Sequence, residues 1–365
     1  MAYPLEPMRA AHLQNVWQIV VKLGTGILTD EHNLPNPAQM EGLVQQIAAL
    51  RHAGKEVIVV SSGAVGAGMG ALKLKNRPTP LPQLQACAAL GQSQLITTYQ
   101  KLFTKKNILT AQVLLTHEDL QDHDRHLNAR NTLSTLIAQG IVPIVNENDA
   151  VSFTELKFGD NDTLSALVAS LLPVDLLVIL TTAEGVIEDF GTPNARRVSV
   201  IKRIDRRIES LATGATSVTA TGGMTTKIQA AKIASRSGIP TIIASGHKKH
   251  ILKNIMEGKD EGTLILPTAS RLKGRKRWIA FFHHPLGQII VDNGAKTALR
   301  ENGKSLLSKG IVRVIGNFSK NDVVSICDLE GTEFGRGMIT LDAPQFSEGQ
   351  IPAKVIVHRN NLVIL

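Results

Sequence analysis

The fold is decided by the stretch Val16-Trp17-Gln18-Ile19-Val20-Val21-Lys22-Leu23-Gly24-Thr25-Gly26, in which an apolar run leads into a lysine and two glycines. The apolar part, Val16–Val21, predicts a buried strand. Glycines let backbone N–H groups approach a phosphate closely, and a lysine adds a positive charge for its oxygens. A second lysine in similar company ends the segment Thr221–Lys227. Two such segments in one chain predict that a phosphoryl group is transferred between two sites, with a cation over each of them. That is the chemistry of a kinase.

Two common nucleotide-binding motifs do not fit these glycines. A Rossmann fingerprint needs a third glycine where this chain has Thr29. A Walker A loop needs a glycine five residues before Gly303-Lys304-Ser305, and Ala298 stands there instead. An ordinary strand-to-helix turn also explains Gly24-Thr25-Gly26. The sequence therefore leaves two alternatives, such a turn or a nucleotide site of another kind.

Strand-like apolar runs alternate with amphipathic helical runs over the first 270 residues. This alternation predicts an α/β fold with a mainly parallel sheet sandwiched between helices. In such sheets the loops beyond the carboxyl ends of the strands form the site. The predicted strands are Val16–Val21, Val57–Val60, Thr110–Leu115, Ile141–Val145, Leu176–Thr181 and Thr241–Ala244, and the predicted helices are Ala38–Ala53, Ala129–Gln139, Leu164–Leu172 and Lys227–Arg236.

A change of composition near residue 271 predicts a second domain. With 365 residues the chain is long for one domain. We predict a loose N-terminal extension at 1–14, an α/β domain at 15–270, a basic linker at 271–277 and a small β-rich domain at 278–365. In that last domain the predicted strands are Ile289–Val291, Val312–Ile315, Val323–Cys327 and Ala353–His358, and the one predicted helix is Ala295–Leu307.

The composition suits a folded protein in a reducing compartment. A hydrophobic content of 43% with 19% charged residues argues against disorder. Cys87 and Cys327 lie far apart in apolar runs, which predicts two buried thiols rather than a disulfide or a metal pair. No apolar run approaches the roughly 18 to 20 residues of a membrane helix, and the first fifteen residues lack the core of a signal peptide. We expect a cytoplasmic protein without membrane contact.

The net charge of +9 is concentrated in the last quarter of the chain. Residues 271–365 carry 14 Lys and Arg against 8 Asp and Glu. Such an excess suits RNA contact through the β-rich domain, and it equally suits a basic face that is simply solvated. Few aromatic residues for stacking bases and no RNA-modifying motif occur in this segment. RNA therefore stays an open alternative for this domain.

Three polar clusters follow predicted strands or open predicted helices. The run Asn146-Glu147-Asn148-Asp149 offers carboxylates for an ammonium and amides for a carboxylate, although a hydrogen-bonded turn explains it equally. Gly159–Thr163 precedes a predicted helix and supplies either its N-cap or more of the same site. Ser61–Gly68 places hydroxyls and glycines at a helix N-terminus, which attracts anions. Together they predict a pocket for a small, highly polar ligand.

Two further groups carry weaker signals. Thr181 and Thr182 end a predicted strand and are suited to flank a nucleotide base or ribose, but turn chemistry explains them as well. His123, Asp124 and His126 predict a polar surface segment rather than metal ligands, because no Cys stands nearby in sequence. We expect no metal ligated by the protein, since the metal of a kinase arrives with the nucleotide.

Seven motifs occur in an order that resembles a known family. Over nearly its whole length the chain closely resembles the glutamate 5-kinases of the amino acid kinase superfamily, and its basic β-rich tail resembles a PUA domain. The motifs are Lys22-Leu-Gly-Thr, Ser61-Ser-Gly-Ala, Ala89-Leu-Gly-Gln92, Asn128-Ala-Arg130, Asn146-Glu-Asn-Asp-Ala-Val151, Gly159-Asp-Asn-Asp162-x-Leu-Ser-Ala-Leu-Val168 and Thr221-Gly-Gly-Met-x-Thr-Lys227.

The resemblance implies ATP-dependent phosphorylation of the side-chain carboxylate of L-glutamate to γ-glutamyl 5-phosphate, the first step of proline biosynthesis, with Mg²⁺ accompanying ATP. It implies that Lys22 and Lys227 contact the phosphoryl group in flight and that Asp162 holds both lysines. It also implies feedback inhibition by proline and a homo-oligomer, a tetramer formed through the kinase domain. The implied glutamate-binding residues are Ser62, Asp149 and Asn161, and the implied ATP-binding residues are Lys22, Thr181, Thr182, Thr221, Gly222, Gly223, Met224, Thr225, Thr226 and Lys227.

The sequence departs from the family pattern on the nucleotide side. Gly26 stands where many members have Ser, Thr182 stands where many have Asp, and the stretch 184–190 lacks the usual Tyr. Gly26 predicts a more flexible loop without the loss of a catalytic group, whereas the departures at Thr182 and 184–190 concern the contacts to base and ribose rather than the transfer chemistry. A rival prediction is a related kinase that acts on acetylglutamate, aspartate or carbamate, and the motifs at Asn146–Val151 and Gly159–Val168 disfavour it.

Overall fold

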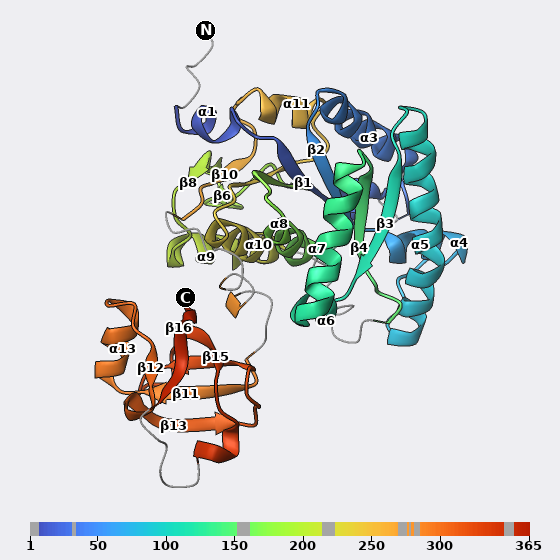
Figure 1. Ribbon diagram of the computed structural model, residues 1–365. Coiled ribbons are helices and arrows are strands. Elements are labelled where there is room, and N and C mark those ends of the chain that lie inside the picture. The colour runs from blue at the N-terminus through green and yellow to red at the C-terminus, as the bar shows by residue number, and fades with distance from the viewer. Residues whose placement is uncertain are drawn as a thin grey trace. The chain divides into compact units, whose positions relative to one another are not determined.

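The computed structural model describes residues 7–30, 34–151, 161–213, 223–268, 276, 279–280, 285–346 and 354–365. The chain folds as two compact units, of which the first contains Met1–Asp119 and His123–Arg271 and the second contains Leu272–Leu365 (Figure 1). Apart from Lys276, the predicted linker 271–277 lies outside the described residues.

The first unit is built on an eight-stranded sheet with the order β3-β4-β2-β1-β5-β9-β10-β8. All neighbouring strands are parallel except β9 and β10, which are antiparallel. The predicted α/β fold with a mainly parallel sheet is therefore confirmed. The strands are β1 (Gln18–Leu23), β2 (Glu56–Ser61), β3 (Thr110–Leu115), β4 (Val142–Glu147), β5 (Leu176–Thr181), β8 (Val200–Ile201), β9 (Thr241–Ser245) and β10 (Thr263–Ile265), and a separate hairpin pairs β6 (Ile187–Glu188) with β7 (Arg196–Arg197).

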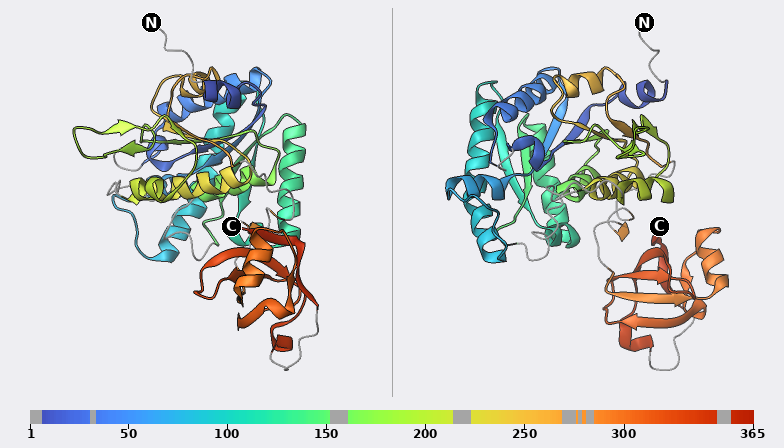
Figure 2. Two further views of the ribbon diagram at one scale, coloured as in Figure 1. Left: turned by 90° about the vertical axis from the view of Figure 1, so that its left-hand side faces the viewer. Right: turned by 180° about the vertical axis from the view of Figure 1, so that it is seen from behind.

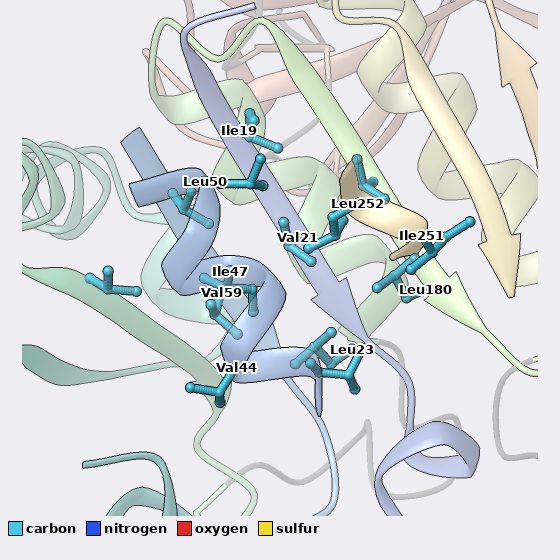
Figure 3. Packing of buried hydrophobic residues seen from close by; sticks show 14 of the residues in the cluster. Ile19, Val21, Leu23, Val44, Ile47, Leu50, Val59, Leu180, Ile251 and Leu252 are labelled. Carbon is cyan, nitrogen blue, oxygen red and sulfur yellow. The ribbon is translucent and has the colours of Figure 1, made fainter. Parts of the chain in front are cut away.

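Helices cover both faces of this sheet, as Figure 2 shows. Strands β1 and β5 are buried along their whole length, which their runs of Val, Ile and Leu explain. On one face, side chains from β1 and β5 pack against α3 (Pro37–His52) and α11 (Ile251–Met256) (Figure 3). The labelled side chains of this cluster are Ile19, Val21, Leu23, Val44, Ile47, Leu50, Val59, Leu180, Ile251 and Leu252.

The opposite face carries the helices that bear the chemistry. Successive side chains of a strand point to opposite faces, so Lys22 points away from the cluster that holds Val21 and Leu23. It meets α8 (Asn161–Leu171), and α8 packs in turn against α10 (Met224–Arg236). The remaining described helices of this unit are α1 (Pro7–Leu13), α2 (Thr25–Leu28), α4 (Ala64–Ala71), α5 (Leu81–Thr104), α6 (His117–Gln121), α7 (His123–Ala138) and α9 (Arg206–Thr213).

Helix α1 corrects the expectation that residues 1–14 form a loose extension. Arg9 of this helix is only 1% exposed. Its guanidinium donates to the backbone carbonyls of Ser199 at 2.7 Å and of Gly262 at 2.9 Å, and it lies 3.0 Å from a carboxylate oxygen of Asp260. Charge-assisted hydrogen bonds of this kind are strong and tie α1 to the edge of the sheet. Residues 1–6 lie outside the described part of the chain.

The second unit is the small β-rich domain that the sequence predicts. Its six strands have the order β12-β16-β15-β14-β11-β13, with a core that includes Ile289, Phe318 and Ile356. Its elements are β11 (Gly287–Val291), α13 (Asn293–Arg300), β12 (Leu306–Leu307), a 3₁₀ turn at Ser308–Gly310, β13 (Ile311–Gly316), β14 (Val323–Cys327), β15 (Glu333–Ile339), a 3₁₀ turn at Ala343–Phe346 and β16 (Val355–Ile364).

The helix predicted at Ala295–Leu307 is shorter than expected. Helix α13 starts earlier, because the side chain of Asp292 accepts a hydrogen bond from the backbone N–H of Ala295 at 2.6 Å and caps it. It ends at Arg300, and Gly303 then adopts a φ of +56°, which a helix does not accommodate. The last two residues of the predicted helix instead pair with β16 as strand β12.

Cys87 and Cys327 are both buried and free, as predicted. Among the helices that the structure describes, none combines the length and the apolar character needed to cross a membrane.

Candidate active site

The carboxyl ends of β1, β2, β4 and β5 meet at one edge of the sheet. Leu23 at the end of β1 pairs with Ser61 of β2 and with Leu180 of β5. Val60 of β2 pairs with Val145 of β4, one residue before the polar loop begins. The loops that carry the residues singled out from the sequence therefore leave the sheet side by side, where parallel α/β sheets bind their ligands.

Lys22, Asp162 and Lys227 form a buried ion triad at this edge. Nζ of Lys22 lies 2.5 Å from Oδ1 of Asp162, and Nζ of Lys227 lies 3.1 Å from Oδ2 of the same carboxylate. The side chains of the two lysines are 6% exposed and that of Asp162 is 2% exposed. Strand β1 and the first turns of α8 and α10 thus contribute one charged group each to the triad.

The ion triad fixes the charge of Asp162. Burial alone would raise its pKa, but the two lysines outweigh burial and, with a hydrogen bond from Thr226, lower the pKa from 3.8 to about 2. Asp162 is therefore an anion at neutral pH with both oxygens engaged, and it is poorly suited to accept a proton. Two ammonium groups beside one carboxylate leave a net positive charge, which attracts phosphate oxygens.

The N-terminus of α10 opens beside the triad. Oγ1 of Thr226 lies 2.7 Å from Oδ2 of Asp162 and 2.9 Å from the carbonyl of Gly223, so its one proton serves two acceptors. Among the described residues, which exclude 214–222, no atom outside Gly223 and its chain neighbours lies within 4 Å of the place that a β-carbon on Gly223 would take. The exposed N–H groups of a helix N-terminus favour anions. The N-terminus of α10 is thus electropositive.

The turn after β1 is held close to β5. The backbone N–H of Gly24 donates to the carbonyl of Leu180 at 3.1 Å. A β-carbon on Gly24 would lie 3.2 Å from that carbonyl oxygen and 3.5 Å from Nζ of Lys22. A side chain at this position would therefore press on the carbonyl of Leu180 and touch the ammonium group of Lys22, which favours glycine here.

An amide cluster adjoins the triad, because Asn161 directly precedes Asp162 in α8. Nδ2 of Asn161 donates to the carbonyl of Ser61 at 3.1 Å, to Oγ of Ser62 at 3.0 Å and to Oδ1 of Asn146 at 3.0 Å. The same Oδ1 accepts a hydrogen bond from the backbone N–H of Glu147 at 2.9 Å. Asn161 therefore connects the ends of β2 and β4 at the first turn of α8.

Two buried polar atoms of this cluster are unused. Since Oδ1 of Asn146 faces two N–H donors and Nδ2 of Asn161 faces acceptors, the orientation of both amides is determined by the network. Nδ2 of Asn146 and Oδ1 of Asn161 then have no hydrogen-bond partner in the described residues. The two side chains are buried, with 2% and 8% exposure. One donor and one acceptor are thus available to a small polar ligand.

The other predicted residues that the structure describes lie at or near the same edge. Ser62 is buried directly after β2, and Asp149 is half-buried in the turn after β4. Thr181 ends β5, buried, and Thr182 follows it, exposed. Of the remaining predicted ATP-binding residues, Met224 is buried, and Oγ1 of Thr225 donates to the carbonyl of Ala212 at 3.2 Å. Thr221 and Gly222 lie outside the described residues, and so do Gly159 and Asp160 of the neighbouring motif.

The part of the chain that the structure describes contains no group of three or more His, Cys, Asp or Glu side chains suited to hold a metal ion. His123, Asp124 and His126 belong to the start of α7. A metal bound at the triad would meet two ammonium charges at close range, since each carboxylate oxygen of Asp162 faces one lysine.

Comparison with known proteins shows the family to which the chain belongs. A model of the amino acid kinase family matches residues 17–245, and a model of the PUA domain matches residues 287–350. The glutamate 5-kinase of Geobacter sulfurreducens is 44% identical over 373 residues, which cover 98% of this chain and 100% of the relative. The chain belongs to the glutamate 5-kinase family of amino acid kinases.

A second glutamate 5-kinase, from Moorella thermoacetica, is 44% identical over 368 residues and covers 97% of each chain. Among solved structures, carbamate kinase from Giardia lamblia bound to AMP-PNP superposes with a TM-score of 0.51 at 18% identity. It covers 70% of this chain and 100% of its own. That similarity supports the amino acid kinase fold of the first unit, which the sheet order already describes.

The structure places the two departures from the glutamate 5-kinase pattern against each other. A β-carbon on Gly26 would lie 2.9 Å from the methyl group of Thr182, which is closer than side chains approach. Both residues are exposed at the mouth of the site. A side chain at position 26 would therefore require Thr182 to move.

Sequence reasoning did not single out three residues that the structure brings to the site. Asn146 was seen as part of a polar run but was given no role of its own. Gln92 and Tyr99 of α5 reach the site from behind, through hydrogen bonds to Glu147 and Ser61. Gln92 lies in one of the seven family motifs, which was the available signal. Tyr99 carries no local signal at all.

Proposed function

We propose that the protein transfers the γ-phosphoryl group of ATP to the side-chain carboxylate of L-glutamate, giving γ-glutamyl 5-phosphate for proline biosynthesis. The observation that carries the proposal is the contact of one buried carboxylate, Asp162, with both Lys22 and Lys227 next to the amide cluster of Asn161. A positive site for phosphoryl oxygens and a polar pocket for the acceptor thus adjoin each other. The names of the curated relatives support the same acceptor.

The chemistry asks for positioning rather than for a base. The acceptor carboxylate is already ionised at neutral pH, so no proton has to be removed before it attacks phosphorus. The barrier arises from the approach of two anions and from charge spread over the transferred oxygens. Lys22 and Lys227 stabilise that charge, and Asp162 keeps both ammonium groups in place without competing for a proton.

ATP lies along the nucleotide side of the edge in this proposal. It is held by Lys22 on the neighbouring strand β1, by Thr181 and Thr182, and by the segment Thr221, Gly222, Gly223, Met224, Thr225, Thr226 and Lys227. The electropositive N-terminus of α10 and the lack of a side chain at Gly24 support a phosphate chain that approaches the backbone closely. Mg²⁺ accompanies ATP on its phosphate oxygens, where it neutralises charge.

Glutamate lies on the other side of the triad. Ser62, Asp149 and Asn161 bind it, and we add Asn146, whose Nδ2 is a buried donor without a partner in the described residues. An amide N–H suits a carboxylate of the substrate, and Asp149 suits its ammonium group. The free Oδ1 of Asn161 provides one more acceptor for that ammonium.

An acceptor assay tests this function. The protein is incubated with ATP and Mg²⁺ and with L-glutamate, N-acetyl-L-glutamate, L-aspartate or carbamate, and acyl phosphate is trapped as hydroxamate. Hydroxamate is expected with glutamate at a rate at least about tenfold above the rate with any other acceptor. Adding proline is expected to lower the glutamate rate, because the protein is regulated by feedback in this proposal. Phosphorylation of acetylglutamate but not of glutamate would overturn the assignment.

Assembly and location complete the proposal. The protein is a homo-oligomer, a tetramer formed through the kinase domain, as the family resemblance implies. It acts in the cytoplasm, and its two free, buried cysteines support a reducing compartment.

RNA contact is the second candidate function, and it concerns the second unit alone. A groove of about 700 Å³ lies between α13 and the 3₁₀ turn at Ser308–Gly310. Lys304, Lys309 and Arg359 line it together with apolar side chains such as Ala298 and Leu306. The two lysines supply cations for phosphates, and the guanidinium plane of Arg359 is suited to stack on a base of single-stranded RNA. The excess of basic residues in this segment points the same way.

A salt-dependent mobility shift tests the RNA contact. The full chain is expected to retard a single-stranded RNA at about 50 mM salt and to release it as salt rises, because phosphate contacts displace counterions. The triple variant K304A/K309A/R359A is expected to lose at least about tenfold in affinity. The control K320A removes a positive charge that does not line the groove and is expected to bind like the parent. Equal binding by the triple variant and the control would contradict the proposal.

A further inference from the structure

The acceptor pocket is supported from behind by α5 (Leu81–Thr104), the longest helix among those described. This helix crosses α4 at very short range. A β-carbon on Gly91 would lie 1.8 Å from the carbonyl oxygen of Ala64, and a β-carbon on Gly68 would lie 1.8 Å from the carbonyl oxygen of Cys87. No side chain fits at either glycine. The backbones of α4 and α5 are therefore in direct contact, next to the turn that follows β2.

Gln92, the residue next to this crossing, reaches the end of β4. It is 8% exposed, and its Nε2 donates to the backbone carbonyl of Glu147 at 3.1 Å. Its Oε1 accepts a hydrogen bond from Nε2 of Gln112 on β3 at 3.3 Å, so the amide is oriented from both sides. Glu147 directly follows Asn146, which carries the unused amide donor of the pocket. Gln92 thus fixes the backbone directly after Asn146.

Tyr99 reaches the end of β2 in the same way. It is fully buried, and its hydroxyl lies 2.8 Å from Oγ of Ser61, which donates in turn to the carbonyl of Ser62 at 3.0 Å. Burial, opposed only in part by the bond to Ser61, raises the pKa of Tyr99, so the hydroxyl keeps its proton. Because Gln92 and Tyr99 are seven residues apart, they lie on the same face of α5.

The two contacts meet in one network. Tyr99 fixes Ser61, whose carbonyl accepts a hydrogen bond from Asn161, and Asn161 also donates to Asn146, which stands beside the carbonyl that Gln92 holds. We propose that Gln92 and Tyr99 are positioning residues, which set the spacing of the two acceptor turns, after β2 and after β4, without touching substrate. The proposal rests on the acceptor function described above, in that these turns bind the phosphoryl acceptor.

The variant Q92M tests the proposal, because methionine keeps the volume and removes both hydrogen bonds. Loss of the hydrogen bond from Gln92 to the part-buried carbonyl of Glu147 is expected to raise KM for glutamate by about 3- to 10-fold. Both kcat and KM for ATP are expected to change by less than about twofold, since the triad and the nucleotide side are untouched. The matched control is Q94M, the same substitution at an exposed position of the same helix, for which all three constants are expected to stay unchanged.

Y99F is the second variant, and it removes one oxygen atom from the network. We expect it to raise KM for glutamate, as Q92M does. It keeps the proposal testable if Q92M does not fold. Unchanged KM for glutamate in folded Q92M or Y99F would overturn the proposal, and so would an equal rise of KM for ATP, which a general loss of structure produces. If the parent protein phosphorylates another acceptor instead of glutamate, the proposed function fails while KM for that acceptor still tests the role of α5.

Discussion

Replacement of Lys22 or of Lys227 by alanine is expected to lower kcat by about 10²- to 10³-fold, the cost of losing one preorganised group that stabilises transition-state charge. Each lysine is nearly inaccessible to solvent and is fixed by Asp162 at 2.5 or 3.1 Å, so no water or neighbouring cation replaces it easily. The measurement is the rate of hydroxamate formation at saturating ATP and glutamate.

The control for this prediction lies on the same helix as Lys227. Lys232 of α10 forms an ion pair with Glu209 of α9 at 2.6 Å, and its side chain is 33% exposed. K232A makes the same lysine-to-alanine change in the same helix, away from the triad. We expect kcat to stay within about twofold of the parent value, because exposed ion pairs contribute little to stability. If kcat of K22A or K227A stays as close to the parent value as kcat of K232A does, that lysine has no role in the mechanism.

Replacement of Asp162 by asparagine is expected to lower kcat by at least about 10²-fold although Asp162 touches no reacting atom. Asparagine keeps the shape but removes the charge that holds two ammonium groups together, and a displacement of about 1 Å at a reacting group costs this much. Removing one partner of a buried ion pair also destabilises a protein by about 3–5 kcal/mol. Steady-state kinetics and urea unfolding at neutral pH measure the two effects.

The pH dependence of stability distinguishes this role of Asp162. Its pKa is lowered from 3.8 to about 2 in the folded protein, so its ionised form stabilises the native state above about pH 4. That stabilisation, about 2 kcal/mol by the size of the shift, is lost as the pH falls from about 4 to about 2. We expect the free energy of unfolding of D162N to lack this part of the acid-induced decrease. Parallel stability curves for the parent and D162N in this range would contradict the assignment.

Most strands of the first sheet could be predicted from the sequence because they are nearly continuous apolar runs. Thr110–Leu115 and Leu176–Thr181 have the predicted bounds, since a polar residue follows each run. Helix α5 was not predicted, because its start after Pro80 resembles a loop and its buried positions include Gly91 and Gln92 as well as apolar residues. Strand β15 was missed for a similar reason, as Gly335 and Gly337 interrupt its pattern.

The site was predictable where the residues form local motifs, and it was not where contacts span the chain. Lys22 and Lys227 each stand beside glycines, and that chemistry is visible in a short window. The contact of both lysines with Asp162 joins segments separated by 140 and 65 residues, and only the family resemblance implied it. The contact of Tyr99 with Ser61 has no such motif, because any buried aromatic residue of a helix produces the same local pattern.

The central claim is that Lys22 and Lys227 serve one divided site through a shared carboxylate. The measurement that tests it most directly is kcat for glutamate phosphorylation by the double variant K22A/K227A beside the two single variants. Groups that act as a unit show losses that do not multiply, so the double variant is expected to lie within about tenfold of the slower single variant. If the losses multiply to the full product of the two single effects, the lysines act independently and the account of one divided site is contradicted.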